Sequence, residues 1–190
     1  MSAPFKPDKP FWTQYWRSIY GVPRAWAVKG ENLVHAFEAV AAASQSGSMH
    51  FDLCDQALML AGMAIEVQLK ALLVNRATIR DVVSGIRNPA NDSERKTLSA
   101  FYSHRLADLA QVAGLALSKE QIAVANSLSQ YIYWRGRYVL PTERGIDDIV
   151  PVVLENGLVG IRHQGITIEG ARDLIEIVIK EVKANLYAKA

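Results

Sequence analysis

The sequence predicts a mainly α-helical protein, an antiparallel bundle of about five helices with a short β-hairpin before the last helix. Residues 53–74 are apolar on two sides and contain no proline. Four further segments repeat apolar residues at helical spacing, and one Asn-Gly pair separates two β-branched runs. The chain has 190 residues, which suits a single domain spanning residues 1–190.

Residues 53–74 are expected to form the central helix, capped by Asp52. Two apolar stripes on one helix indicate neighbours on more than one side. One stripe consists of Leu53, Ala57, Leu60, Ala64, Val67, Ala71 and Val74, and the other of Leu58, Ala61, Ile65, Leu69 and Leu72. The polar minority, Glu66, Gln68 and Lys70, is close together.

In the N-terminal part of the chain, the sequence predicts an aromatic arm over residues 1–25 and a first long helix over residues 26–43. Within the arm, a short helix is expected to begin at Pro10, because proline suits the first turn of a helix. An aromatic stripe can dock on the core as a lid or stack nucleic-acid bases. Its members are Phe11, Trp12, Tyr15, Trp16, Ile19 and Tyr20. His35, beside the stripe of the first helix, is expected to be a hydrogen-bonded structural residue.

Three more helices are expected after a connection over residues 75–97 that holds at most one short helix. The first covers residues 104–113 and stops at Gly114. The second begins at a capping box of Ser118 and Gln121 and runs to about Trp134. Its apolar stripe consists of Ile122, Ala125, Leu128 and Ile132. The last covers residues 171–187 and opens at Thr167 or Glu169.

Residues 149–168 predict a surface β-hairpin. Asn156-Gly157 lies between β-branched runs, which is a strong hairpin signal. Pro151 favours an exposed ribbon over a central strand.

Composition excludes several classes of protein. A net charge of +2 does not indicate a strongly basic nucleic-acid binder. The single cysteine, Cys54, rules out an internal disulfide and is expected to be a buried structural thiol. The longest unbroken apolar run, residues 57–65, is shorter than a membrane span, and no signal peptide is visible, so we expect a cytoplasmic protein that does not bind a membrane. No phosphate-binding loop, zinc motif or nucleophile elbow occurs, and no cofactor or metal site is predicted.

One polar constellation remains. Glu66 and Lys70 are four residues apart, in the favourable order for an ion pair. One interpretation is a structural pair, shared with Arg105, Arg135 or Arg137. The other is a polar groove for a phosphate-and-base ligand, near Tyr131, Tyr133 and Trp134. The candidate ligand-binding residues are Glu66, Lys70, His104, Arg135, Arg137 and Tyr138.

At these residues the chain resembles the HEPN superfamily (higher eukaryotes and prokaryotes nucleotide-binding). The resemblance covers residues 26–141. Its segments are Ala64-Ile65-Glu66 with residues 69–73, Ser103-His104-Arg105-Leu106 with Leu109, and Trp134-Arg135-Gly136-Arg137-Tyr138 with Pro141. The resemblance implies an antiparallel bundle that forms a homodimer. It further implies a role in toxin–antitoxin or defence systems, sometimes beside a nucleotidyltransferase-like partner protein.

The catalytic members of that superfamily are metal-independent ribonucleases in which four to six residues separate an arginine from the histidine that follows it. Residues 28–30, 43–45, 97–99 and 156–158 stand at that spacing before the four histidines, and none is arginine. The leading hypothesis is therefore a non-catalytic, HEPN-like binding or interaction module, with a nucleotide or RNA as the candidate ligand. One alternative is an unconventional ribonuclease with His104 as acid/base and Arg135 or Arg137 for transition-state charge. Another is a structural partner protein with an exposed face at Phe11, Trp12 and Trp16.

Overall fold

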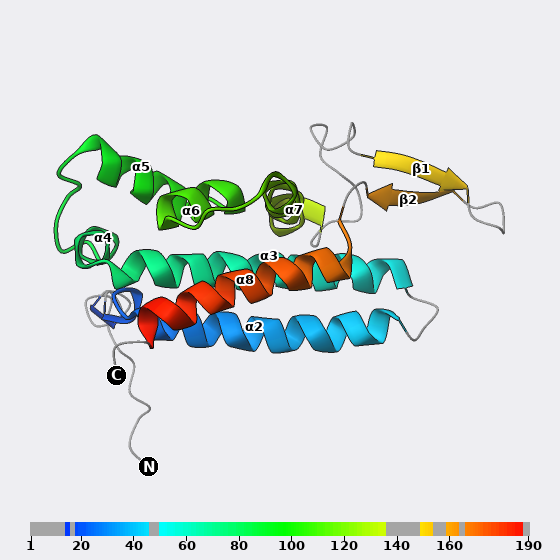
Figure 1. The fold of residues 1–190 in the computed structure, drawn as a ribbon, viewed down its shortest axis with the longest axis horizontal. Helices are drawn as coiled ribbons and strands as arrows, with labels where there is room; N and C mark the ends of the chain where they lie inside the picture. The colour runs from blue at the N-terminus through cyan, green and yellow to red at the C-terminus, as the bar shows by residue number, and fades with distance from the viewer. Residues whose placement is uncertain are drawn as a thin grey trace, which may run out of the picture.

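The protein is a helical bundle organised around one central helix. A computed structural model describes residues 14–15, 18–45, 50–135, 149–153, 159–163 and 166–187. The central helix is α3 (His50–Asn75), and α2 (Pro23–Ser44) and α8 (Ile168–Leu186) pack along it. The other helices cover a different side of α3 (Figure 1). They are α4 (Ala77–Val83), α5 (Asp92–Phe101), α6 (Leu106–Ala113), α7 (Lys119–Gln130) and the π-helical turn η1 (Tyr131–Arg135).

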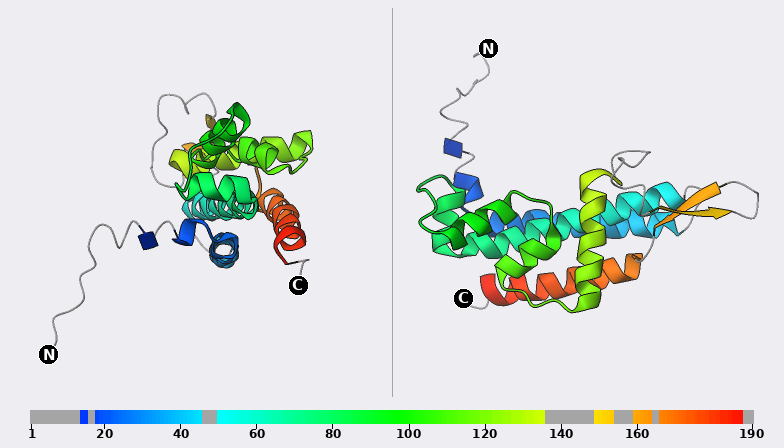
Figure 2. Two further views of the ribbon diagram at one scale, coloured as in Figure 1. Left: turned by 90° about the vertical axis from the view of Figure 1, so that its left-hand side faces the viewer. Right: turned by 90° about the horizontal axis from the view of Figure 1, so that it is seen from above.

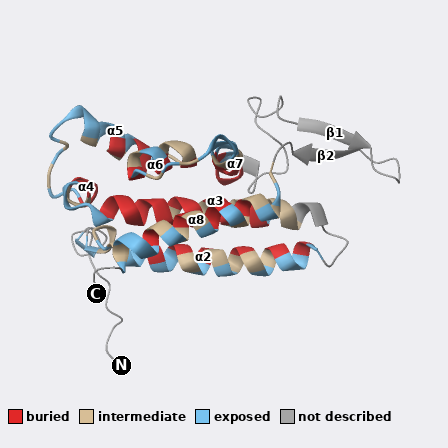
Figure 3. Ribbon diagram, in the orientation of Figure 1, coloured by how far each residue is buried: buried red, intermediate tan, exposed pale blue. Residues whose placement is uncertain are grey.

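Burial confirms the central helix. Nearly all of α3 between residues 57 and 74 is buried or half-buried, whereas α2 and α5 each keep an exposed face (Figure 3). The segment Leu53–Asn75 is long and apolar enough to cross a membrane, but 78% of the apolar 18-residue stretch within it is buried inside the protein. Neighbouring helices therefore already cover its apolar surface, as expected for a core helix. Cys54 is only half-buried, contrary to the expected buried thiol.

Several predicted helix ends are confirmed. Ser118 accepts a hydrogen bond from the backbone N–H of Gln121, whose side chain accepts one from the Ser118 backbone N–H. Thr167 caps α8 through the N–H of Gly170. Gly114 ends α6 with φ of 80°, a left-handed conformation that glycine adopts without strain.

Other predictions were wrong. Residues 75–97 contain all of α4 and the start of α5. Few residues of α4, among them Ile79 and Val82, are buried, so the sequence shows no clear helical period there. The central helix begins at His50, two residues before its expected cap. Ile122 is 40% exposed rather than part of the α7 stripe, and His35 lies on the exposed face of α2.

Two glycines allow α3 to pack closely against its neighbours. A Cβ at Gly62 would lie 2.9 Å from Ile132 Cγ1 and 3.1 Å from the Leu128 carbonyl oxygen. A Cβ at Gly30 would lie 2.7 Å from the Gln68 side chain, whose Nε2 donates to the Ala27 carbonyl oxygen at 3.1 Å. Helix α7 crosses α3 instead of running along it (Figure 2), and Gly62 lies where α7 passes into η1.

Two short strands lie between η1 and α8 in the sequence. β1 (Ile149–Val153) and β2 (Val159–His163) pair antiparallel, with Ile149 opposite His163. They lie beyond α7, away from α2 (Figure 1). The expected Asn-Gly turn falls in residues 154–158, outside the described residues.

Only part of the aromatic arm is described. Tyr15 is 45% exposed, and the Tyr20 ring packs edge to face on Trp26 at 5.2 Å. Phe11, Trp12 and Trp16 lie outside the described residues, so the choice between a lid and a base-stacking arm stays a prediction.

Candidate functional site

The candidate site begins with an ion pair on the central helix. Glu66 and Lys70 are one turn apart on α3, and Lys70 Nζ lies 2.5 Å from Glu66 Oε1. The two residues are 7% and 8% exposed. A buried carboxylate and a buried ammonium each require a partner of opposite charge, and here the two groups are each other's partner.

His104 completes the hydrogen bonding of the Glu66 carboxylate. Its Nδ1 lies 2.8 Å from Glu66 Oε2, so the two carboxylate oxygens serve two different partners. His104 belongs to the connection between α5 and α6. That connection is held in place where α6 begins, because the Leu106 N–H donates to Ser129 Oγ of α7 at 3.0 Å.

Aromatic rings surround this cluster on two sides. Lys70 Nζ lies 5.2 Å from the centre of the Phe101 ring, within reach of a cation–π attraction. Phe101 packs edge to face on Trp26 at 5.5 Å and on Tyr102 at 5.4 Å. On the other side, the His104 and Tyr133 rings meet edge to face, with centroids 5.2 Å apart.

The members of the cluster differ in their access to solvent. The side chains of Glu66 and Lys70 are 9% and 10% exposed, whereas that of His104 is 39% exposed. Tyr133 is 51% exposed. The solvent-accessible part of the cluster is therefore the imidazole of His104 and the phenol of Tyr133, with the ion pair behind them.

The π-helical turn determines where Tyr133 lies. Tyr131 and Ile132 are each 1% exposed, so this turn anchors itself in the core and presents the next residue outward. Single π-helical turns inside helices are frequent at functional sites. Here the turn places an aromatic ring beside a carboxylate-bound histidine.

The structure brings together three of the six residues predicted to bind ligand, namely Glu66, Lys70 and His104. Arg105, one of the three arginines named as a further partner of the Glu66–Lys70 pair, instead lies 3.1 Å from Asp108 of α6. The Arg135 side chain, Arg137 and Tyr138 lie outside the described residues. The predicted groove formed by all six therefore stays a prediction.

Sequence analysis missed Phe101, the ring beneath Lys70. The available signal was weak, because Phe101 follows the charged run of α5 as its last residue. Thr97, Ala100 and Phe101 are the buried face of that helix. Recognising α5 as amphipathic was the only route to this residue from the sequence.

Other charged clusters join secondary-structure elements. Arg172 of α8 makes a two-pronged ion pair with Glu38 of α2, at 2.9 and 2.8 Å, and this hydrogen bonding lowers the pKa of Glu38. Arg76 donates to the carbonyl oxygens of Val112 and Ala113 at the end of α6. Within the described residues, no three His, Cys, Asp or Glu side chains gather as a metal-binding group.

Comparison with known proteins adds no relative. No family model matches the chain. No curated protein and no solved structure matches it either.

Proposed function

We propose that this chain is a HEPN-like, non-catalytic module that binds a nucleotide or RNA at His104 and Tyr133. The observation that carries the proposal is the shared carboxylate of Glu66. It binds buried Lys70 through one oxygen and half-exposed His104 through the other. This arrangement fixes the orientation of an accessible imidazole next to an exposed aromatic ring, a pairing suited to the edge and face of a nucleobase.

The bundle architecture and the order of the matching segments support the HEPN-like part of the proposal. The segments with Glu66 and His104 lie on α3 and in the α5–α6 connection, where the two side chains touch. The segment containing Arg135 begins within η1, which packs on α3. A ribonuclease is not the leading proposal because no arginine precedes a histidine at the required spacing.

Binding of fluorescently labelled oligoribonucleotides, measured by anisotropy, tests this function. Tyr133→Leu removes the exposed ring and should weaken binding by about tenfold, as base–aromatic stacking typically contributes ~1–3 kcal/mol. The matched variant Tyr133→Phe keeps the ring and should bind nearly as well as wild type. Equal binding by all three proteins, or no binding by wild type, rejects the proposal.

An unconventional ribonuclease is the second candidate, favoured by the 2.8 Å contact between Glu66 and His104. A carboxylate that accepts from Nδ1 orients an imidazole for proton transfer at its other nitrogen. Incubation of total RNA with wild type and His104→Ala decides this candidate. Cleavage by wild type alone supports it, and equal cleavage by both proteins, or none, rejects it.

We further propose that the chain works in the cytoplasm as a homodimer, beside a nucleotidyltransferase-like partner protein, in a toxin–antitoxin or defence system. These assignments derive from the HEPN resemblance. Light scattering after size-exclusion chromatography tests the dimer, and a monomeric mass of 21.0 kDa at micromolar concentration rejects it.

A further inference from the structure

The two nitrogens of His104 have different surroundings. Nδ1 lies 2.8 Å from Glu66 Oε2. Within the described part of the chain, Nε2 has no hydrogen-bond partner. A carboxylate only accepts hydrogen bonds, so the proton of this contact must reside on Nδ1.

The Glu66–Lys70 ion pair lies behind His104. Lys70 already balances the charge of Glu66 across 2.5 Å. The three residues are therefore neutral overall when His104 carries one proton. In a neutral imidazole whose Nδ1 is protonated, Nε2 has a lone pair and acts as a hydrogen-bond acceptor.

The nearby cations whose side chains the structure describes do not form an anion site. Lys70 is 8% exposed and engaged with Glu66 and the Phe101 ring. Arg105, next to His104 in the chain, pairs with Asp108. The described surroundings of His104 thus offer an acceptor nitrogen and the exposed Tyr133 ring.

From this geometry we infer that Glu66 holds His104 as the Nδ1–H tautomer, and that Nε2 accepts a hydrogen bond from an uncharged ring ligand carrying an amino or hydroxyl group. For the function proposed above, on which this inference rests, His104 reads the nucleoside part of the ligand rather than its phosphate. Glu66 is then a positioning residue, since it acts on the ligand only through His104.

The tautomer can be measured without any ligand. Long-range ¹H–¹⁵N correlation spectra of the full chain, labelled at histidine, distinguish the two tautomers and the imidazolium. The signals of His104 are assigned by their absence in His104→Asn. We expect a protonated Nδ1 and an acceptor-type Nε2 in wild type. In Glu66→Met/Lys70→Met, which removes both charges and keeps the side-chain length, the tautomers should mix. An Nε2–H tautomer or an imidazolium at neutral pH in wild type overturns the inference.

Calorimetric titration with the four ribonucleosides, their monophosphates and inorganic phosphate then tests the ligand class. We expect at least one nucleoside to bind about as tightly as its monophosphate, with no competition from inorganic phosphate. His104→Asn keeps an amide N–H about where Nδ1 lies and has no atom at Nε2. It should weaken nucleoside binding by about tenfold, as expected for one hydrogen bond.

The outcomes separate this inference from the proposed function. Binding that requires the phosphate, or that inorganic phosphate displaces, overturns the inference while nucleotide binding itself stands. Absence of binding by every nucleoside, nucleotide and oligoribonucleotide overturns both. Equal nucleoside binding by wild type and His104→Asn overturns the role of Nε2 alone.

Discussion

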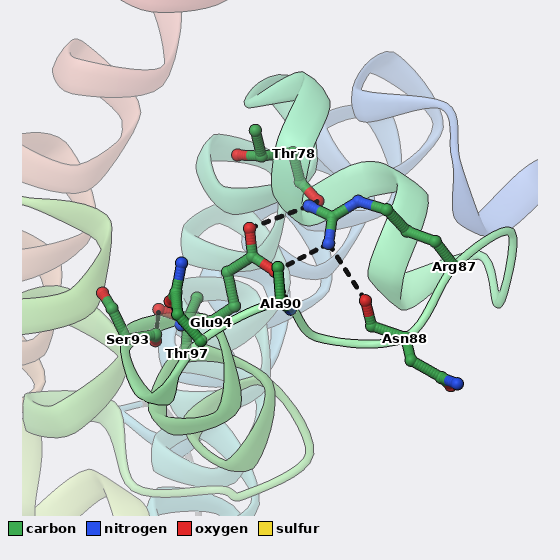
Figure 4. Close-up of polar contacts among 8 residues, drawn as sticks. Thr78, Arg87, Asn88, Ala90, Ser93, Glu94 and Thr97 are labelled. Carbon is green, nitrogen blue, oxygen red and sulfur yellow. Dashed lines mark hydrogen bonds and ion pairs between the residues drawn. The ribbon is translucent and has the colours of Figure 1, made fainter.

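Two carboxylates of this protein each bind two partners, with different consequences. Glu94 of α5 accepts two hydrogen bonds from Arg87, at 2.7 and 2.8 Å, and one from the Ala90 N–H (Figure 4). Arg87 donates further to the carbonyl oxygens of Thr78 and Asn88. Every contact of this cluster joins α4, α5 and the loop between them, so the cluster stabilises a connection.

Glu66 differs from Glu94 in where its partners lie. One partner, Lys70, is buried beside it on the same helix, and the other, His104, is half-exposed and keeps a nitrogen free within the described residues. A cluster that satisfies all its groups internally indicates structural use. A cluster that leaves one accessible group unsatisfied can bind something else.

The largest effect on stability is expected from breaking the buried Glu66–Lys70 pair. Glu66→Ala leaves Lys70 buried without its carboxylate, and should lower the free energy of unfolding by about 3–5 kcal/mol. Urea denaturation followed by circular dichroism measures this change. The control Glu66→Met/Lys70→Met removes both charges and should stay close to wild type. An unchanged urea midpoint for Glu66→Ala contradicts the assigned burial.

A smaller effect is expected at the contact that supports Tyr133. Gly62→Ala places a Cβ 2.9 Å from Ile132, and overpacking of this kind costs about 1–3 kcal/mol. The better helix propensity of alanine offsets up to about 1 kcal/mol, so we expect a net loss of stability. Because Ile132 belongs to η1, oligoribonucleotide binding should weaken as well.

Gly170→Ala is the matched control for this change. Its Cβ would find Thr167 Oγ1 at 3.4 Å and Val124 at 3.8 Å, which are ordinary contacts. Thermal and urea unfolding should show no loss for Gly170→Ala. Equal stability of the two variants would contradict the close packing at Gly62.

The start of α7 provides a third test. Ser118→Ala removes both side-chain hydrogen bonds of the Ser118 hydroxyl, with the Gln121 N–H and the Glu120 carboxylate. Loss of such a cap costs about 1 kcal/mol. Ser118→Thr retains the hydroxyl and should recover most of the stability in urea unfolding. A full loss in the threonine variant would show that the cap is not the cause.

The smallest effect is expected at the Arg87–Glu94 cluster, and it depends on pH. Hydrogen bonds from Arg87 and then from the Ala90 N–H lower the pKa of Glu94 to about 2, from an ordinary value of 4.5. A carboxyl with a lowered pKa in the folded state stabilises the protein above its ordinary pKa and loses this contribution as the pH falls. The stability difference between wild type and Arg87→Ala should thus be constant above about pH 5.5 and shrink between pH 4.5 and about 2.

Arg87→Lys is the control for this pH series. Lysine keeps the charge and lacks the planar two-pronged geometry, so it should lie between wild type and Arg87→Ala. Unfolding in urea at each pH measures all three proteins. A difference that does not vary with pH would show that Glu94 is not the group involved.

The predictable parts of the fold are those decided within a few residues. The two stripes of residues 53–74, the Ser118 box and the stop at Gly114 depend on local spacing or on one conformation. Residues 75–97 were expected to hold at most one short helix, and the second helix that begins there was missed because α4 and α5 are short and few of their residues are buried. In the candidate site the Glu66–Lys70 pair was predictable for the same local reason, since i and i+4 share a helix face.

By itself, the sequence determined a helical bundle around an apolar central helix and an ion pair on that helix. Only the tertiary structure decided that the second carboxylate oxygen of Glu66 binds His104, 38 positions further along the chain. The physical reason is that the path of the α5–α6 connection depends on how α6 and α7 pack, including the bond from Leu106 to Ser129. Helix period sets which residues share a face, whereas contacts between distant segments are set by the packing of whole helices.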